Sequence, residues 1–354
     1  LIGGILIPIF GLMMIGDGSI LDGLSTLTTE NPDKFKSMGG PTDPVPFYTI
    51  FTGMMLVQLF YWGTNQQIIQ RALGAKDLKE GQKGLLLASF IKILGPLIVV
   101  LPGIIAFHLF QGNLESADSA YPMLVKKVLP GAWVGFFAAV LFGAILSSFN
   151  SVLNSSVTLF GIDVYKEHIN KNADEKTIVK YGKTFGVILA IASMFIAPLI
   201  ANAGSLFDYL QEINGIYSIP ILTIIVVGYL TKRVPAIAAK IGLVSGCLLY
   251  IISQFFMKDY FINKALETAK ASGITDEAAL TLVEVQAYPH FLDVMAILFI
   301  LNVVIMLIIG KIKPREEPFV QQYTKQVDIT PWKYVKHAGI AICVIVIGVY
   351  VYFA

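Results

Sequence analysis

Charged residues are scarce in this sequence. Only 14% of its 354 residues are Asp, Glu, Lys or Arg, whereas soluble domains average about 25%. It has just two cysteines, Cys247 and Cys343, and both lie inside apolar runs. We therefore expect membrane-buried thiols rather than a disulfide or a metal site. There is no basic block, and the net charge is only +2, so nothing predicts a nucleic-acid partner.

Catalytic motifs are also lacking. The four histidines are scattered near span ends and loops, and the chain has no HExxH, CxxC, GxSxG or ATP-binding P-loop motif. These patterns carry metal, redox, acyl-transfer and nucleotide chemistry. We predict that the protein is not an enzyme and needs no organic cofactor. Any transport must then run on an ion gradient or run downhill.

Apolar sequence dominates instead. The chain is 55% hydrophobic with a mean hydropathy of +0.71. Several runs reach the roughly 20 residues that a helix needs to cross a bilayer. Their length and lack of strict alternation exclude β-barrel strands. The sequence predicts an all-α polytopic membrane protein, with residues 1–354 forming one transmembrane domain. The nine predicted spans are about 1–16, 46–70, 84–110, 131–161, 182–202, 205–230, 235–256, 290–310 and 337–354.

Positive charge alternates between the connections. Segments 71–83, 163–183, 231–240 and 311–336 together hold 18 of the 26 Lys and Arg residues. Because cytoplasmic loops are enriched in these residues, we expect Leu1 on the cytoplasmic side and Ala354 outside, in a plasma membrane such as the bacterial inner membrane. The chain starts at Leu1 within an apolar run, so we expect an N-terminal part to be missing from it.

Segment 258–289 is too polar to span. The composition of this segment predicts an external amphipathic helix or helical pair, or alternatively a solvated loop without regular structure.

The span at 46–70 carries polar and aromatic residues at a depth where polar groups are costly. Gln58, Tyr61, Trp62 and Asn65 share one helical face. Gly63 and the following Thr offer a place where the helix can break, and broken helices expose backbone groups to a ligand. Rings and amides together suit a neutral polyhydroxyl ligand. The alternative is a kinked helix whose amides bond to neighbouring helices.

Two other spans carry possible ligand donors. Lys92 lies eight residues inside its span, about 12 Å deep. It either donates to a ligand or neighbour, or snorkels to the interface. Phe207 and Gln211 lie one turn apart in the span at 205–230. They form either a ring above an amide on the wall of a cavity, or part of the ordinary polar surface at the membrane interface.

The span at 131–161 has a stripe of small and hydroxyl-bearing residues. It includes Ala144, Ser147 and Ser148 and continues to Thr158. Such a stripe lets helices pack closely. Alternatively, its hydroxyls and helix carbonyls supply the uncharged oxygens that a sodium ion prefers.

Several segments resemble one family. Residues 61–76 (YWGTNQQIIQRALGAK), 144–148 (AILSS), 154–160 (NSSVTLF), 205–211 (SLFDYLQ) and 232–235 (KRVP) are similar to the sodium/glucose- and sodium/galactose-type cotransporters of the sodium:solute symporter family. The match runs over most of the chain in the same order. The resemblance implies the LeuT-type inverted-repeat fold, with 46–230 as the second five-helix repeat and the N-terminal repeat largely outside this chain.

The resemblance also implies roles for individual residues. Tyr61 would stack on the sugar and close the cytoplasmic exit, and Phe207 would close the external side. Other sugar contacts would come from Gln58, Trp62, Lys92 and Gln211. Sodium would bind the Ala144 carbonyl and the hydroxyls of Ser147 and Ser148.

The implied function is sodium-driven uptake of galactose or glucose by alternating access. Sodium, a small sugar and the lipid bilayer are the expected partners, and the oligomeric state is open. Two alternatives stay open: a symporter for an amino acid, vitamin or anion, and a channel or non-transporting solute sensor.

Overall fold

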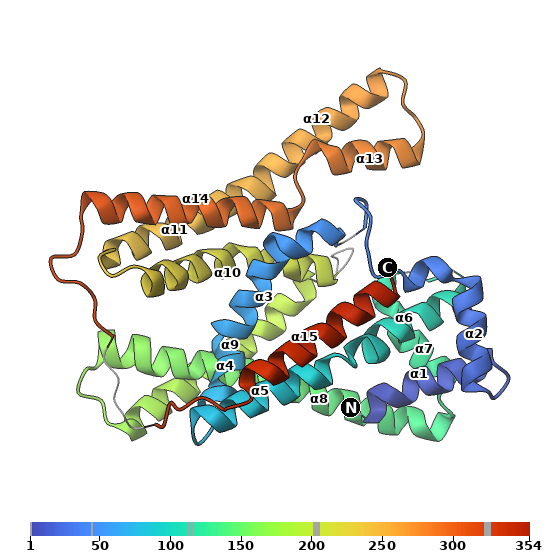
Figure 1. Cartoon of the computed structure of the whole chain (residues 1–354), viewed down its shortest axis with the longest axis horizontal. Coiled ribbons are helices and arrows are strands. Elements are labelled where there is room, and N and C mark those ends of the chain that lie inside the picture. Colours follow the sequence, from blue (N-terminus) through green and yellow to red (C-terminus); the bar gives the residue numbers. More distant parts are fainter. Residues whose placement is uncertain (1, 44, 112, 115, 201–205, 322–326) are drawn as a thin grey trace. The chain divides into compact units, whose positions relative to one another are not determined.

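The regular secondary structure is helical throughout the described residues. The computed structural model describes residues 2–43, 45–111, 113–114, 116–200, 206–321 and 327–354, without the side chains of residues 2, 207 and 208. Every regular element in these ranges is a helix (Figure 1). The structure thus confirms the all-α prediction. The chain divides into two compact units. The first is Leu1–Lys36, Gln70–Leu206 and Ile329–Ala354, and the second is Ser37–Ile69 and Phe207–Asp328.

The first unit begins with a bent helix pair. Helices α1 (Ile2–Ile15) and α2 (Ile20–Glu30) meet at 78°, where Asp17 and Gly18 both have positive φ. Helix α1 packs against α2 and α6. Their apolar faces bury Ile7, Leu27 and Ile105 completely. A short 3-10 turn, η1 (Pro32–Phe35), follows.

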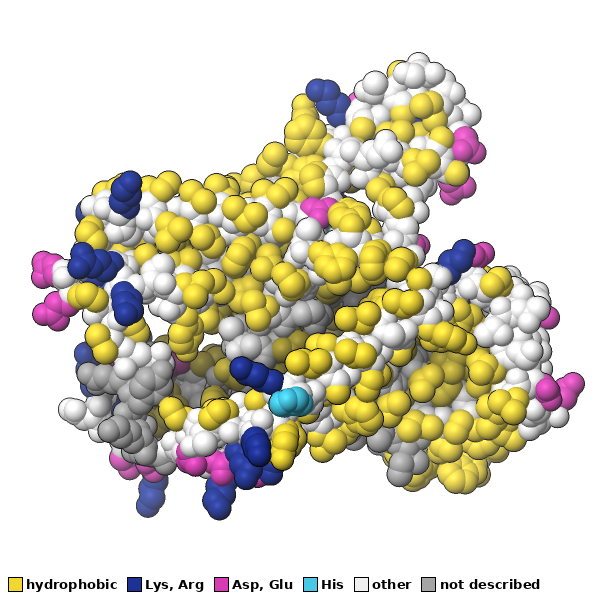
Figure 2. All heavy atoms as spheres, viewed as in Figure 1, with side chains coloured by type: hydrophobic (Ala, Val, Ile, Leu, Met, Phe, Trp, Pro, Cys, Tyr) yellow, Lys and Arg dark blue, Asp and Glu magenta, His cyan; other side chains and the backbone are white. Residues whose placement is uncertain are grey.

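Long apolar helices form the rest of this unit. They are α5 (Leu78–Lys92), α6 (Gly95–Phe110), α7 (Ala120–Val128) with the turn η3 (Ala117–Ser119) before it, α8 (Gly131–Leu159), its π-helical continuation η4 (Phe160–Ile169), α9 (Glu175–Ile200) and α15 (Val335–Tyr352). Helices α8 and α9 pack together, and the ring of Phe160, the first residue of η4, stacks on the Phe185 ring of α9 with 4.2 Å between the ring centres. Hydrophobic side chains cover much of the visible surface (Figure 2), as expected for helices that face lipid.

The second unit is built around helices that enclose a separate core. Its elements are η2 (Phe47–Phe51), α3 (Gly53–Gly63), α10 (Leu206–Leu230), α11 (Ala236–Ile252), the π-helical η5 (Ser253–Met257), α12 (Lys258–Ala271), α13 (Glu277–Ala287) and α14 (Phe291–Ile312). The core joins Val57 of α3, Ile219 of α10, Tyr250 of α11 and Met295 of α14. Helix α4 (Gln66–Leu73) connects this unit to the first.

Small residues let α10, α11 and α14 approach closely. A Cβ at Gly246 would lie 2.7 Å from Pro220 and 2.8 Å from Asn302. The buried Asn302 amide donates to the Gly242 carbonyl at 2.9 Å. Gly242 and Gly246 form the small-xxx-small spacing that brings membrane helices together.

The number of continuous helices that could span a membrane is smaller than the nine predicted spans. Among the described residues, seven helices are long and apolar enough to cross a membrane, or eight if the α1–α2 pair counts as one broken span. The predicted span 46–70 is not among these continuous helices, because the chain there is divided into η2, α3 and α4, none of which exceeds 11 residues. The predicted polar segment 258–289 is a helical pair, α12 and α13.

Candidate functional site

The chain breaks between α3 and α4, at the point where Gly63 and Thr64 predicted it. The Phe60 carbonyl accepts three hydrogen bonds, from the Thr64 backbone at 2.9 Å, the Thr64 hydroxyl at 2.8 Å and the Asn65 backbone at 3.1 Å. The Asn65 side chain then accepts from the Gln67 backbone at 3.0 Å and begins α4. Bonds within the break therefore satisfy the Phe60 carbonyl and the Gln67 backbone N–H.

Two aromatic rings and an amide lie directly before this break. The Trp62 indole donates to the Gln58 side-chain oxygen at 2.9 Å. The rings of Tyr61 and Trp62 meet edge to face at 5.3 Å. Gln58 and Trp62 are exposed, and Tyr61 is half-buried. Because Gln58 holds the indole through one helical turn, its clearest role is to orient Trp62.

Helix α10 lies against α3 in the same unit. Phe60 and Tyr217 form an edge-to-face pair at 5.9 Å, and Val57 and Ile219 share the core. Gln211 is half-buried on α10. The structure thus brings the helix of Tyr61 into contact with the helix of Gln211. The side chain of Phe207, predicted as the external gate, lies outside the described residues.

Gln211, Asn214 and Ser218 form a polar stripe along α10, and two oxygens of this stripe have no partner among the described residues. These are the side-chain oxygens of Asn214 and Ser218, both buried. Buried polar groups in native proteins are almost always paired, often by ordered water. The stripe therefore has spare hydrogen-bonding capacity in the interior of the second unit.

Lys92 ends helix α5 in the first unit, directly before the break at Ile93 and Leu94 that separates α5 from α6. The side chain is exposed. The predicted ammonium donor therefore lies at a helix break, as Tyr61 does.

The predicted sodium ligands lie on one stretch of α8. Ala144, Ser147 and Ser148 are all exposed in the described structure. Ser147 lines an open groove of about 740 Å³ together with Asn150, Asn154 and other polar residues. Ala144 and Ser148 are not among the residues that line this groove.

Arg71 is a neighbour of this site that the sequence did not reveal. Its guanidinium donates to the Ser151 hydroxyl, and that hydroxyl donates to the Ser147 carbonyl at 3.1 Å. The Gln70 amide reaches the Ser151 carbonyl at 3.5 Å. A hydrogen-bonded chain thus connects α4 with a predicted sodium ligand. The only sequence signal was that Arg71 is the first charge after the polar cluster of α3.

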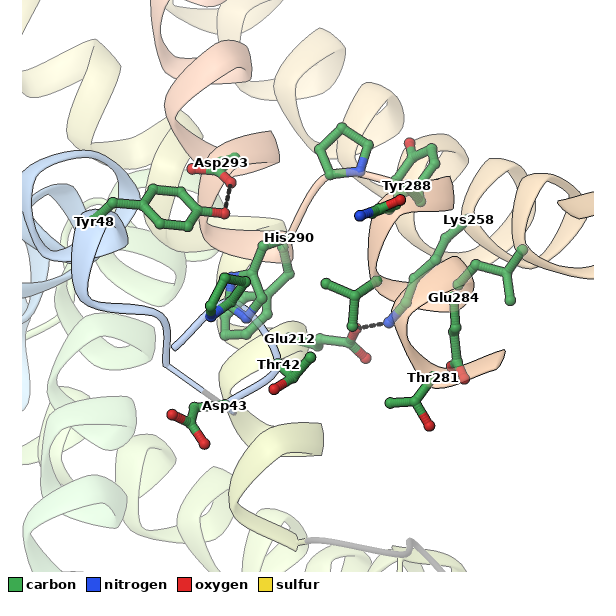
Figure 3. A pocket seen from close by; sticks show the side chains of 16 residues that line it. Thr42, Asp43, Tyr48, Glu212, Lys258, Thr281, Glu284, Tyr288, His290 and Asp293 are labelled. Carbon is green, nitrogen blue, oxygen red and sulfur yellow. Dashed lines mark hydrogen bonds and ion pairs between the residues drawn. The ribbon is translucent and has the colours of Figure 1, made fainter. Parts of the chain in front are cut away.

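A second cavity, of about 530 Å³, lies among η2, α10, α12, α13 and α14 (Figure 3). Two hydrogen bonds reach the Asp293 carboxylate, from Tyr48 at 2.8 Å and Thr52 at 3.2 Å. Glu212 of α10 pairs with Lys258 of α12 at 2.5 Å. These contacts connect the base of the α12–α13 hairpin and the start of α14 to the rest of the unit. The residues that line this cavity therefore stabilise the fold.

Among the described residues, no group of three or more His, Cys, Asp or Glu side chains could hold a metal ion. Hydroxyl, amide and carbonyl oxygens are the remaining ligands for a cation, and the groove on α8 is rich in them.

Comparison with known proteins gives related transporters. An uncharacterized symporter, YidK of Escherichia coli, is 47% identical over 99% of this chain and 56% of its own length. The sodium/glucose cotransporter of Vibrio parahaemolyticus is 34% identical over 72% of the chain and 51% of its length. The human sodium/myo-inositol cotransporter 2 is 32% identical over 60% of the chain.

The chain spans about half the length of the first two relatives. It resembles the E. coli protein more than the Vibrio sugar cotransporter, so the specific likeness to the Vibrio type is the weaker one. The Sodium:solute symporter family profile matches residues 1–246. On this match and on these identities, the chain belongs to the sodium:solute symporter family, a family of transporters rather than enzymes.

Proposed function

We propose that the protein is a secondary active transporter that couples inward sodium flow to the uptake of a hexose, galactose or glucose, by alternating access. The observation that carries this proposal is the cluster on α3, where two rings and an amide adjoin a helix break. Aromatic faces and amides recognise the C–H faces and hydroxyls of a neutral polyol. The 34% identity to a sodium/glucose cotransporter supports this assignment.

In this mechanism the sugar stacks on Tyr61, while Gln58 holds Trp62 beside it. Lys92 and Gln211 donate to sugar hydroxyls. Phe207 closes the external side, and Tyr61 closes the cytoplasmic side. The LeuT-type arrangement, with 46–230 as the second repeat, supplies the two alternating states and is itself part of the proposal.

Sodium binds the Ala144 carbonyl and the hydroxyls of Ser147 and Ser148. Each sodium that crosses a membrane potential of 100 mV releases about 2.3 kcal/mol, which supports a sugar accumulation of roughly 50-fold. Departure of sodium toward the cytoplasm then frees the Tyr61 gate.

Uptake by the full-length protein in liposomes tests the proposal. An imposed inward sodium gradient should drive accumulation of labelled galactose or glucose, and a potassium gradient should not. Ser148→Ala should abolish the sodium dependence. Ser156→Ala is the matched control, because that hydroxyl bonds within the same helix to the Val152 carbonyl. Uptake by Ser148→Ala with unchanged sodium dependence would refute the sodium site.

A different neutral polyol is the second candidate substrate, because one relative is named a sodium/myo-inositol cotransporter. Competition by galactose, glucose, myo-inositol, proline and pantothenate separates the candidates. Displacement by proline or pantothenate alone would refute polyol transport altogether. Sodium current that does not saturate and needs no solute would identify a channel, and binding without uptake would identify a sensor.

A further inference from the structure

The segment after α14 folds back onto the connection between α10 and α11. The Arg315 backbone donates to the Arg233 carbonyl at 2.9 Å, and the Phe319 backbone donates to the Lys232 carbonyl at 2.8 Å. These bonds join parts of the chain about 80 residues apart. They hold residues 313–321 along the ends of the helices.

This segment closes one side of a cavity of about 350 Å³. The other walls come from the last turns of α10, the first turn of α11 and Met306 of α14. The wall is mainly apolar, with Thr231, Arg315 and Gln321 as its principal polar residues. A Cβ at Gly228 would meet no atom within 4 Å, so the cavity is open beside this residue.

The cavity lies at the ends of spanning helices. Two candidate spans end there, at Leu230 and Ile312, and a third begins at Ala236. Because these helices are long and apolar enough to cross a membrane, we expect the apolar wall to lie beside the lipid and the polar residues to lie near the membrane interface.

Positive charge is concentrated in the chain segments that form the cavity. Arg315 lines the cavity, and Lys232, Arg233, Lys311 and Lys313 lie close to its lining residues in the sequence, together with the acidic Glu316 and Glu317. Among the described residues, none of these five cations forms an ion pair. The Arg315 guanidinium lies 5.5 Å from the centre of the Phe319 ring. Figure 2 shows basic side chains gathered at this end of α10, α11 and α14.

We propose that this cavity binds an anionic phospholipid. One acyl chain enters the apolar cavity beside Gly228, and the phosphate is bound by the Arg315 guanidinium, with neighbouring basic residues adding attraction. Guanidinium groups bind phosphate in a forked geometry, and basic pockets between membrane helices bind acidic headgroups. A free phosphate would leave the apolar wall unused, so the lipid is the better match. The site is independent of the transported solute.

Lipid retention by the full-length protein tests this site. The protein is reconstituted in phosphatidylethanolamine bilayers that contain increasing amounts of phosphatidylglycerol, and is then extracted in mild detergent. Native mass spectrometry measures the lipid that stays bound to it. Arg315→Gln removes the charge, and Gly228→Phe fills the cavity without changing any charge. Arg315→Gln should lower the apparent affinity for phosphatidylglycerol about fivefold. Gly228→Phe should lower it as well, and neither variant should change phosphatidylethanolamine retention.

Two matched controls accompany these variants. Lys264→Gln removes a cation from α12, and Gly348→Phe adds a ring on α15, where a Cβ would also meet no atom within 4 Å. Both should keep wild-type retention, and thermal unfolding identifies any variant that is misfolded. Equal phosphatidylglycerol retention by wild type and a folded Arg315→Gln would overturn the proposal. Displacement of the lipid by millimolar inorganic phosphate would instead identify a phosphate site and also overturn it.

Discussion

At the scale of single residues, we propose a distinct role for each of Gln58, Tyr61 and Trp62 from their contacts. Gln58 lies one turn before Trp62 and accepts its indole N–H at 2.9 Å. This hydrogen bond fixes the indole beside Tyr61. The ring faces then provide the surface for the proposed sugar, while Gln58 orients one of them.

Substitution of Tyr61 tests the stacking role. Tyr61→Ala should weaken apparent galactose or glucose affinity by roughly tenfold, because a lost ring contact costs about 1.5 kcal/mol. Tyr61→Phe retains the ring, so its apparent affinity for the sugar should stay within about threefold of the wild-type value. Equilibrium binding of labelled sugar in saturating sodium measures both. Undiminished binding by Tyr61→Ala would exclude stacking on this ring.

We propose that Arg71 acts on the predicted sodium site of α8 through Ser151, because its guanidinium donates to the Ser151 hydroxyl. Arg71→Lys replaces the guanidinium by an ammonium on a shorter side chain, and Arg71→Gln replaces it by a shorter, neutral amide, so neither keeps the guanidinium contact with the Ser151 hydroxyl. Because a hydrogen bond from a charged donor contributes about 1.5–3 kcal/mol, we expect both to raise the sodium concentration for half-maximal uptake several-fold. Lys76→Gln, at an exposed cation of the same connection, should leave it unchanged.

The two Arg71 variants separate hydrogen bonding from charge. If Arg71 acted mainly by repelling sodium, Arg71→Gln would lower the half-saturating concentration and Arg71→Lys would not. Such a split would contradict the positioning role.

At the scale of elements, the approach of α3 to α14 depends on one glycine. A Cβ at Gly53 would lie 1.8 Å from the Leu292 carbonyl oxygen. Since that neighbour is backbone, Gly53→Ala must displace the start of α3 or of α14. The same contact region holds the Thr52 bond to Asp293.

Gly53→Ala should destabilise the protein by about 1–3 kcal/mol, the usual cost of overpacking. Gly84→Ala is the control, because a Cβ there would meet no atom within 4 Å. It should be neutral or stabilising by up to about 1 kcal/mol, since alanine favours helix over glycine. Thermal unfolding in detergent measures both. Equal melting temperatures for Gly53→Ala and Gly84→Ala would contradict this packing.

At the scale of the whole molecule, charge alternation predicts the orientation in the membrane. Cysteines introduced singly, after Cys247→Ser and Cys343→Ser, test it. In intact cells an impermeant maleimide should label Thr281→Cys on α13 and leave Lys79→Cys and Lys176→Cys unlabelled. Permeabilised cells should label all three. The reverse pattern in intact cells would invert the orientation.

The sequence by itself determined the properties that depend on local composition. Long apolar runs predicted a helical membrane protein because a bilayer satisfies no backbone groups. The break at Gly63 was also predictable, since its hydrogen bonds come from the next two residues. Motif resemblance predicted the family that the profile match shows.

Contacts between distant segments required the tertiary structure. The link from Arg71 through Ser151 to Ser147 joins α4 to α8. Arg71 and Ser151 are 80 residues apart in the sequence, so no local pattern predicts their contact. The cavity at the ends of α10, α11 and α14 is closed on one side by residues 313–321, whose Arg315 and Phe319 backbones bond to the Arg233 and Lys232 carbonyls. Hydropathy and periodicity describe which face of each helix is apolar, but they do not pair one segment with another. That pairing is decided by close packing and by hydrogen bonds between residues far apart in the chain.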